Sequence, residues 1–268
     1  MDNDLPLGRP VDHPRRYDRS VLRRIERRTG RETIGITGPL PFTGEDVWHC
    51  YEFSWLAPTG IPRVAVLTVR VPVDSPYIVE SKSLKLYLNG FAGSTFEGPD
   101  VVVERIEADL GRETGEALRA SIEAADDTQT PGNFKSDCLD GLSVTTEHYQ
   151  RAPQFLVSSG ESGRDAVHTH LFRTLCPVTG QPDWGSVAID YRGRLIGRAS
   201  LLRYLVSYRD TAVFHEVAAE QLFVDLHEAT GATDLTVDAR FLRRGGIDIN
   251  PFRSTCRSDA PRIRLPRQ

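Results

Sequence analysis

Two stretches of this chain resemble each other, and their similarity decides the fold. Residues 53–71 read FSWLAPTGIPRVAVLTVRV, and residues 172–191 read FRTLCPVTGQPDWGSVAIDY. The matches continue downstream, where SLKLYL at residues 83–88 corresponds to SLLRYL at residues 200–205. The offset between matching positions stays near a constant value, about 116 to 120 residues, as expected of an internal repeat. The chain therefore contains two copies of one structural unit.

Each copy has the same order of local patterns. An apolar run leads through a Pro/Thr/Gly turn into a strand with alternating apolar residues, and two amphipathic helices follow. A β-rich stretch closes each copy, at residues 117–124 and 235–242. This order predicts ββααββ, an antiparallel sheet with two helices on one face, in the α+β class. On the same alignment, Phe96 and Glu97 correspond to His215 and Glu216.

The repeat also suggests a division of the chain. We expect an N-terminal module at residues 36–127 and a C-terminal module at residues 166–268. A segment rich in turn-forming residues, 128–165, bridges them, and the arginine-dense residues 1–35 are expected to form an exposed arm.

Composition excludes several classes of protein. The 268 residues have a net charge of −4, which argues against a protein that coats a polyanion. The apolar runs are much shorter than the ~20 residues of a membrane-spanning helix. The N-terminus has neither a basic start nor an apolar stretch, so no secretory signal is expected. These features predict a soluble, cytoplasmic protein with no membrane or nucleic-acid partner.

The four cysteines are widely spaced and include no CxxC pair, which disfavours both a disulfide framework and a structural zinc site. Between the copies, Cys176 is aligned with Ala57, and Asp183 is aligned with Arg63. A thiol and a carboxylate present in only one copy predict a single active centre, in the C-terminal half. Cys50, Cys138 and Cys256 have no comparable neighbours in the sequence, so they are expected to be unreactive.

Four motifs together resemble one enzyme family. They are CPVTGQPDWGS at residues 176–186, FHE at 214–216, ESKSLKLYLNGF at 80–91 and RRGGIDINPFRS at 243–254. In this order they are similar to the NADPH-dependent 7-cyano-7-deazaguanine reductases, the nitrile reductases of queuosine biosynthesis, in the long two-module form. The similarity extends from about residue 40 to the C-terminus. It implies tandem T-fold (tunnelling-fold) modules whose sheets join into a barrel across subunits, and it suggests a homodimer.

The resemblance also implies a reaction in tRNA modification. The nitrile would be reduced to a primary amine, giving 7-aminomethyl-7-deazaguanine, at the expense of two NADPH. Cys176 would attack the nitrile carbon and form a covalent thioimide, which divides one difficult step into easier ones. Asp183 would donate the proton to the nitrile nitrogen, for which its pKa should be raised by burial.

The remaining site residues also come from the resemblance. Adjacent N–H donors of a deazaguanine suit carboxylate acceptors, for which Glu80 and Glu216 are the candidates. The chain has no GxGxxG after a strand, so the NADPH assignment depends on the resemblance alone. The residues implied to contact the substrate are Val79, Glu80, Ser81, His215 and Glu216, and those implied to contact NADPH are Ser81, Lys82, Arg244 and Gly245.

Two other functions fit parts of the sequence. One is a purine or pterin hydrolase of the GTP cyclohydrolase type on the same fold, which needs a metal. His168 and His170 lie near Cys176, and on a strand their side chains would share one face. The family pattern gives these histidines no metal role, and no metal is expected. The other is a module that binds purines or tRNA, which the negative charge and the Cys176–Asp183 asymmetry disfavour.

Overall fold

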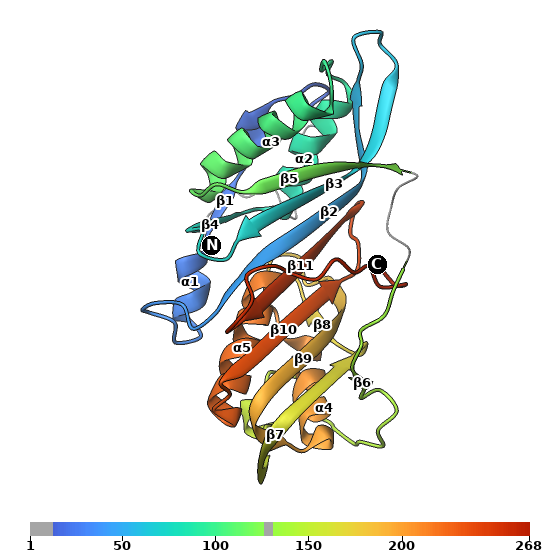
Figure 1. The fold of residues 1–268 in the computed structure, drawn as a ribbon. Helices are drawn as coiled ribbons and strands as arrows, with labels where there is room; N and C mark the ends of the chain where they lie inside the picture. Colours follow the sequence, from blue (N-terminus) through green and yellow to red (C-terminus); the bar gives the residue numbers. More distant parts are fainter. Residues whose placement is uncertain (1–12, 126–130) are drawn as a thin grey trace. The chain divides into compact units, whose positions relative to one another are not determined.

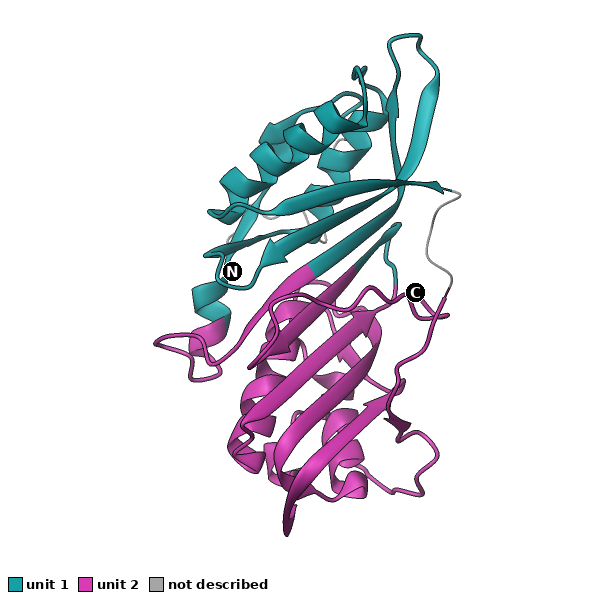
Figure 2. Ribbon diagram, viewed as in Figure 1, with its two compact units in different colours: residues 1–30, 47–130, 243–248 teal, residues 31–46, 131–242, 249–268 magenta. Residues whose placement is uncertain are grey.

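The computed structural model describes residues 13–125 and 131–268 (Figure 1). The chain combines antiparallel β-sheets with a small number of helices, so the α+β class is confirmed. It divides into two compact units (Figure 2). Unit 1 comprises residues 1–30, 47–130 and 243–248, and unit 2 comprises residues 31–46, 131–242 and 249–268. Within the described residues, no helix is both long enough and apolar enough to cross a bilayer.

Unit 2 contains the second copy and shows the expected order of elements. Strands β11, β10, β9 and β7 lie side by side and antiparallel, and helices α4 and α5 pack behind this sheet (Figure 1). The elements of the second copy are β7 (Ser158–Thr169), β8 (Arg173–Leu175), β9 (Pro182–Ile196), α4 (Arg198–Ser207), η4 (Tyr208–Asp210), α5 (His215–Thr230), β10 (Asp234–Phe241) and β11 (Ile247–Ser254). The two helices between strands and the closing pair β10 and β11 are as predicted, but the strand predicted before the turn is the short β8, and the first strand of the sheet is β7, which overlaps the predicted bridge.

The core of unit 2 forms between the inward-facing residues of β9 and one face of α5. On β9, every second residue faces inward, and Val187, Ile189 and Tyr191 are each at most 1% exposed. On α5, Leu222 and Leu226 are fully buried at the i, i+4 spacing of one helix face. Packing of this face on the sheet holds the start of α5 in place, and two of the candidate site residues lie there.

Unit 1 contains the first copy, with one difference. Its sheet has the order β5, β3, β2, and α2 and α3 follow β4 in the chain. The bounds are β2 (Thr43–Leu56), β3 (Pro62–Pro72), β4 (Tyr77–Val79), α2 (Ser81–Ala92), α3 (Pro99–Thr114) and β5 (Arg119–Ala124). Only β5 follows α3 among the described residues of this copy, so its predicted second closing strand is wrong. The next strand, β6 (Asp137–Cys138), pairs in parallel with β7 of unit 2 instead.

Matching backbone hydrogen bonds in the two copies correct one detail of the sequence alignment. Leu56 accepts from the N–H of Phe96 at 3.0 Å, and Leu175 accepts from the N–H of Val213 at 2.9 Å. Phe96 therefore corresponds to Val213, and its alignment with His215 was wrong. The offset of Phe96 and Val213, 117 residues, equals that of the SLKLYL and SLLRYL match just upstream, whereas the pairing with His215 needed 119.

A side-chain contact between helices recurs in both copies. The Tyr87 hydroxyl of α2 donates to Asp109 Oδ2 of α3 at 2.9 Å. The Tyr204 hydroxyl of α4 donates to Asp225 Oδ2 of α5 at 2.5 Å. All four side chains are buried. The repeat therefore preserves a polar contact between its two helices as well as an apolar pattern.

The described N-terminal region has regular structure and a few buried side chains, although most of its side chains are exposed or half-buried. η1 (Arg19–Val21), β1 (Arg24–Glu26) and α1 (Arg27–Glu32) lie in it, and β1 pairs antiparallel with β4. Leu22, Arg27 and Arg31 are less than 9% exposed. Arg31 Nη2 pairs with a carboxylate oxygen of Glu220 at 2.9 Å, which offsets the burial of its charge. The prediction of an exposed arm is therefore wrong for these residues, and residues 1–12 lie outside the described part.

The expected bridge contains regular structure of its own. β6, η3 (Pro153–Phe155) and the first half of β7 all fall between residues 131 and 165. Residues 126–130 lie outside the described part of the chain. The module boundaries read from the sequence stay a prediction.

Candidate active site

Cys176 lies in the tight turn that joins β8 to β9. Its N–H donates to the carbonyl of Gln181 at 2.8 Å, and its carbonyl accepts from the N–H of Gly180 at 2.9 Å. Gly180 has a φ of 69°, a left-handed conformation that favours glycine. The Cys176 residue is 5% exposed. The turn therefore holds the thiol in a fixed, largely water-free position.

The first copy makes the same turn without the thiol. The Ala57 N–H donates to the carbonyl of Ile61 at 3.0 Å, its carbonyl accepts from Gly60 at 2.8 Å, and Gly60 has a φ of 82°. Because the backbone does not need a cysteine at this position, the presence of Cys176 in the second copy has no structural explanation in the turn itself.

Asp183 and His215 form a close pair in unit 2. Asp183 stands on β9 opposite Thr174 of β8 and is 4% exposed. His215 Nε2 lies 3.3 Å from Asp183 Oδ2. The His215 ring stacks on Phe241 of β10, with centroids 3.8 Å apart and planes 11° apart. Neither ring nitrogen makes a hydrogen bond of good geometry with the described residues. An imidazole and a carboxylate thus lie in contact at a largely buried position.

The backbone brings this pair to the Cys176 turn. The segment before α5 pairs with Leu175, which donates to the carbonyl of Thr211 and accepts from Val213, each at 2.9 Å. Cys176 follows Leu175 directly, and His215 is two residues after Val213. Glu216 is the second residue of α5, 4% exposed, where the helix dipole favours a carboxylate. The backbone pairing therefore places the turn of Cys176 beside the segment that leads to His215 and Glu216, and Asp183 contacts His215 within the same unit.

Glu80 has a local structural role in unit 1. It is the N-cap of α2, and its carboxylate accepts from the N–H groups of Lys82 and Ser83, both at 2.7 Å. It is 1% exposed, and Val79 at the end of β4 is 5% exposed. The carboxylate is thus held rigidly by the backbone of the helix, in the way that an N-cap residue satisfies N–H groups that have no partner within the helix.

The residues implied to bind the cofactor also lie in unit 1. Arg244 pairs with Ile247 across a turn in which Gly245 and Gly246 have φ values of 62° and 80°. A Cβ on Gly245 would lie 3.4 Å from Lys85 Cδ of α2, so this turn packs against the helix that carries Ser81 and Lys82. Basic side chains around a close-packed glycine turn fit the phosphates of a dinucleotide. Sequence reasoning missed Lys85, whose i, i+3 spacing from Lys82 was the available signal.

The other cysteines differ in their surroundings. All four are free thiols. Burial, followed by the charge of Asp248, raises the pKa of the Cys50 thiol, as expected of an unreactive core cysteine. Cys138 is exposed and lies beside His168 and His170, a contact that its sequence neighbours do not indicate. The sequence could not show this contact, because Cys138 is 30 residues from the nearer histidine.

Comparisons with known proteins agree on one family. Residues 13–122 match the family described as “Nitrile reductase, 7-cyano-7-deazaguanine-reductase N-term”, and residues 182–260 match “QueF-like protein”. One solved structure, of the archaeosine synthase QueF-Like in the apo form, is 18% identical and covers 38% of this chain and 99% of its own. Its TM-score is 0.31, which supports no argument about the fold.

Full-length relatives establish the family. A protein of Chromohalobacter salexigens is 44% identical, covering 98% of this chain and 96% of its own length. A protein of Burkholderia mallei is 43% identical, covering 96% and 95%. A protein of Paraburkholderia phymatum is 42% identical, covering 98% of both chains. Each is named NADPH-dependent 7-cyano-7-deazaguanine reductase. This chain therefore belongs to the family of NADPH-dependent 7-cyano-7-deazaguanine reductases.

Proposed function

We propose that this protein reduces the nitrile of 7-cyano-7-deazaguanine to the amine of 7-aminomethyl-7-deazaguanine with NADPH, as a step of tRNA queuosine biosynthesis. The observation that carries the proposal is the Cys176 turn. Only the second copy has a thiol there, and the same hairpin carries Asp183, which contacts His215 at 3.3 Å. Family membership favours this reaction over hydrolysis of a purine or pterin.

In the first step, Cys176 Sγ forms a bond to the nitrile carbon, and one π bond of the nitrile breaks. The electron pair of that bond goes to nitrogen, which takes a proton from Asp183 and gives a thioimide. In this proposal Asp183 is protonated when the substrate is bound, so that it can act as the proton donor. The proton of the Cys176 thiol passes to His215 as the sulfur adds, and His215, which orients Asp183 through the 3.3 Å contact, returns that proton to Asp183.

Bound NADPH supplies hydride to the former nitrile carbon, two equivalents for each nitrile. After the first reduction the C–S bond breaks, the Cys176 thiolate leaves and an imine remains. The second reduction and a proton complete the amine. The 5% exposure of Cys176 limits access of water, which protects the imine from hydrolysis.

Residues of both copies contribute to recognition in this proposal. Glu216 and Glu80 accept the adjacent N–H donors of the deazaguanine, and His215, Val79 and Ser81 make further contacts to it. Lys82 and Arg244 bind phosphates of NADPH, Ser81 and Gly245 contact it, and Lys85 adds positive charge beside the Gly245 turn.

We also propose that the two copies are T-fold modules and that the protein acts as a homodimer in the cytoplasm. The ββααββ order of the second copy supports the fold assignment, and closing a barrel from such sheets needs a second chain. Light scattering during size-exclusion chromatography should give twice the mass of one chain. The mass of a single chain would contradict the dimer.

The reaction mechanism is tested by trapping the adduct. With 7-cyano-7-deazaguanine and no NADPH, the protein should gain the full mass of one substrate molecule, because addition to a nitrile expels no group. Cys176→Ala should gain none, whereas Cys256→Ala, which removes an exposed thiol, should behave as the wild type. With NADPH added, two equivalents should be oxidised for each nitrile consumed. An adduct in Cys176→Ala would disprove the proposed nucleophile.

A further inference from the structure

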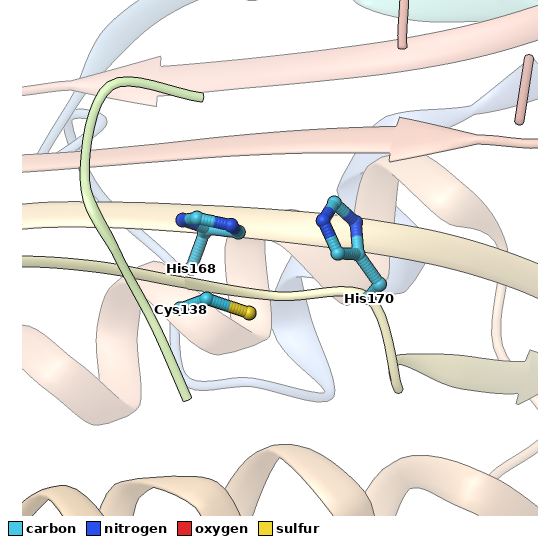
Figure 3. A group of neighbouring side chains, drawn as sticks. All are labelled: Cys138, His168 and His170. Carbon is cyan, nitrogen blue, oxygen red and sulfur yellow. The ribbon is translucent and has the colours of Figure 1, made fainter. Parts of the chain in front are cut away.

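Three side chains outside the proposed active site converge on one point of unit 2. The Sγ of Cys138 and one ring nitrogen each of His168 and His170 all lie within 4.8 Å of one another. Figure 3 shows the sulfur and the two rings directed toward a shared space. None of the three residues has a role in the proposed nitrile reduction.

The backbone explains why these groups meet. His168 lies near the end of β7 and His170 directly follows it, so their side chains point to one face with the period of two of a strand. Cys138 lies on β6 and is paired in register with His168. The donors therefore come from adjacent hydrogen-bonded strands, which hold ligands more firmly than a loop does.

Two serines fix the orientation of the histidine rings. Ser136 Oγ lies 3.0 Å from His168 Nδ1, and Ser186 Oγ lies 2.8 Å from His170 Nδ1. When each Nδ1–H donates to its serine, the lone pair is on Nε2, which can then coordinate a metal. Metal-binding histidines are typically held in this way, with the second ring nitrogen engaged by a protein group.

The surroundings keep both rings available for coordination. His168 is 7% exposed, so its ring is largely removed from water. Phe134 packs against both rings, with centroids 5.4 Å and 6.4 Å away, and shields them from solvent on one side. Asp140 is engaged elsewhere, accepting from Thr169 Oγ1 at 2.6 Å.

We propose that Cys138, His168 and His170 bind one divalent transition-metal ion of the zinc class, through Sγ and the two Nε2 atoms, with water as the fourth ligand. One thiolate and two imidazoles match the preference of zinc, and three protein ligands leave one position open. Zinc–ligand bonds of that kind place donor atoms about 3.5 Å apart. The 4.8 Å cluster therefore has to contract by about 1 Å, which rotation of the exposed Cys138 can provide. The ion would tie the two-residue strand β6 to β7.

The experiment measures zinc directly. The protein is reduced with a phosphine and dialysed against buffered Zn²⁺. The amount of bound metal per chain is then measured by inductively coupled plasma mass spectrometry. One ion per chain is expected. Cys138→Ser and His168→Gln should each weaken binding at least tenfold, and Ser136→Ala should weaken it less. In the Co²⁺-loaded protein, a thiolate-to-metal absorption band should be present and should disappear in Cys138→Ser.

Matched controls separate this site from the proposed active site. Cys256→Ser removes the other exposed thiol and should bind zinc as the wild type does. Cys176→Ala should also retain the ion, because the Cys176–Asp183–His215 group is not the site. Stoichiometric zinc in Cys138→Ser, loss of zinc in Cys176→Ala, or no zinc in the wild type would each overturn the inference. None of these results depends on nitrile reduction.

Discussion

Cys176 and Ala57 occupy corresponding turns of the two copies, but only Cys176 has a side chain that can act as a nucleophile. Both occupy turns closed by the same pair of backbone hydrogen bonds, with a left-handed glycine in each. The sequence repeat predicted this equivalence, and the structure adds that the turn does not need the sulfur. The contact of His215 with Asp183 was not predictable, because it depends on how β8 and β9 pair with the segment before α5.

Glu80 combines two roles, and the structure changes how its role in binding should be tested. Glu80→Leu would remove the cap of α2 together with the proposed substrate acceptor, and loss of an N-cap costs about 0.5–2 kcal/mol. Lys82 donates to Oε1 and Ser83 to Oε2, so Glu80→Gln keeps one of the two capping acceptors and loses the charge. We expect Glu80→Gln to weaken substrate binding about tenfold or more, because charge-assisted hydrogen bonds are stronger than neutral ones.

The test of Glu80 compares calorimetric binding of 7-cyano-7-deazaguanine with urea unfolding of the same variants. Glu80→Gln should lose affinity but only part of the stability that Glu80→Leu loses, because one capping acceptor remains. Glu80→Leu should lose both. If the affinity of Glu80→Gln is unchanged, Glu80 is a capping residue only.

At the scale of elements, the same tyrosine–aspartate hydrogen bond joins the two helices of each copy, which supports the repeat independently of the sequence match. Asp109 and Asp225 are both 4% exposed, so each carboxylate depends on its partners for hydrogen bonds. We expect Tyr87→Phe and Tyr204→Phe each to lower the free energy of unfolding by about 1–3 kcal/mol, because one acceptor site of a buried carboxylate loses its donor.

This expectation is checked by urea unfolding followed by circular dichroism. Tyr149→Phe is the matched control, since Tyr149 is 38% exposed and its hydroxyl makes only a 3.4 Å contact. Its effect should be within about 0.5 kcal/mol. Equal unfolding midpoints for all three variants would show that the two contacts between the helices do not contribute to stability.

The sequence predicted the elements of the second copy well, because strand alternation and helix spacing are local patterns. It did not predict the ionic interior of unit 2. Arg253 is fully buried and binds Asp46 at 2.8 Å and Glu220 at 3.0 Å, and Glu220 also binds Arg31. Arg253 and Asp46 lie 207 positions apart, and each residue of this network alone resembles an ordinary surface charge. Burial of such charges depends on their pairing, which only the fold establishes.

Pairing between distant residues also explains why the buried arginines near the N-terminus were not predicted. Arginines at high density usually indicate a solvated segment, but β1 pairs with β4, and the Arg27 Nε donates to Ser75 Oγ at 3.2 Å. The cluster of Cys138 with two histidines was missed for a related reason, because strand pairing between β6 and β7 has no local signal in the sequence.

At the scale of the whole molecule, buried tyrosines make stability sensitive to alkaline pH. Burial raises the pKa of both Tyr204 and Tyr208 above the usual value of 10.0. Below that value both hydroxyls are protonated in the folded and in the unfolded chain, and their contribution to stability is fully present. Above it the unfolded chain releases two protons that the folded chain keeps, so stability falls as the pH rises.

The expected slope is about 1.4 kcal/mol per pH unit for each tyrosine above pH 10, because a tenfold change in proton activity corresponds to that free energy. Urea unfolding of the protein at several pH values between 9 and 11.5 measures this slope. Tyr208→Phe removes one of the two groups, so its stability should decline less steeply than that of the wild type by the contribution of one tyrosine. Other groups titrate in this range, but they are common to both proteins and cancel in the difference. Parallel pH profiles for the two proteins would mean that Tyr208 ionises as readily in the folded chain as in the unfolded one. In that case burial would not raise the pKa of Tyr208.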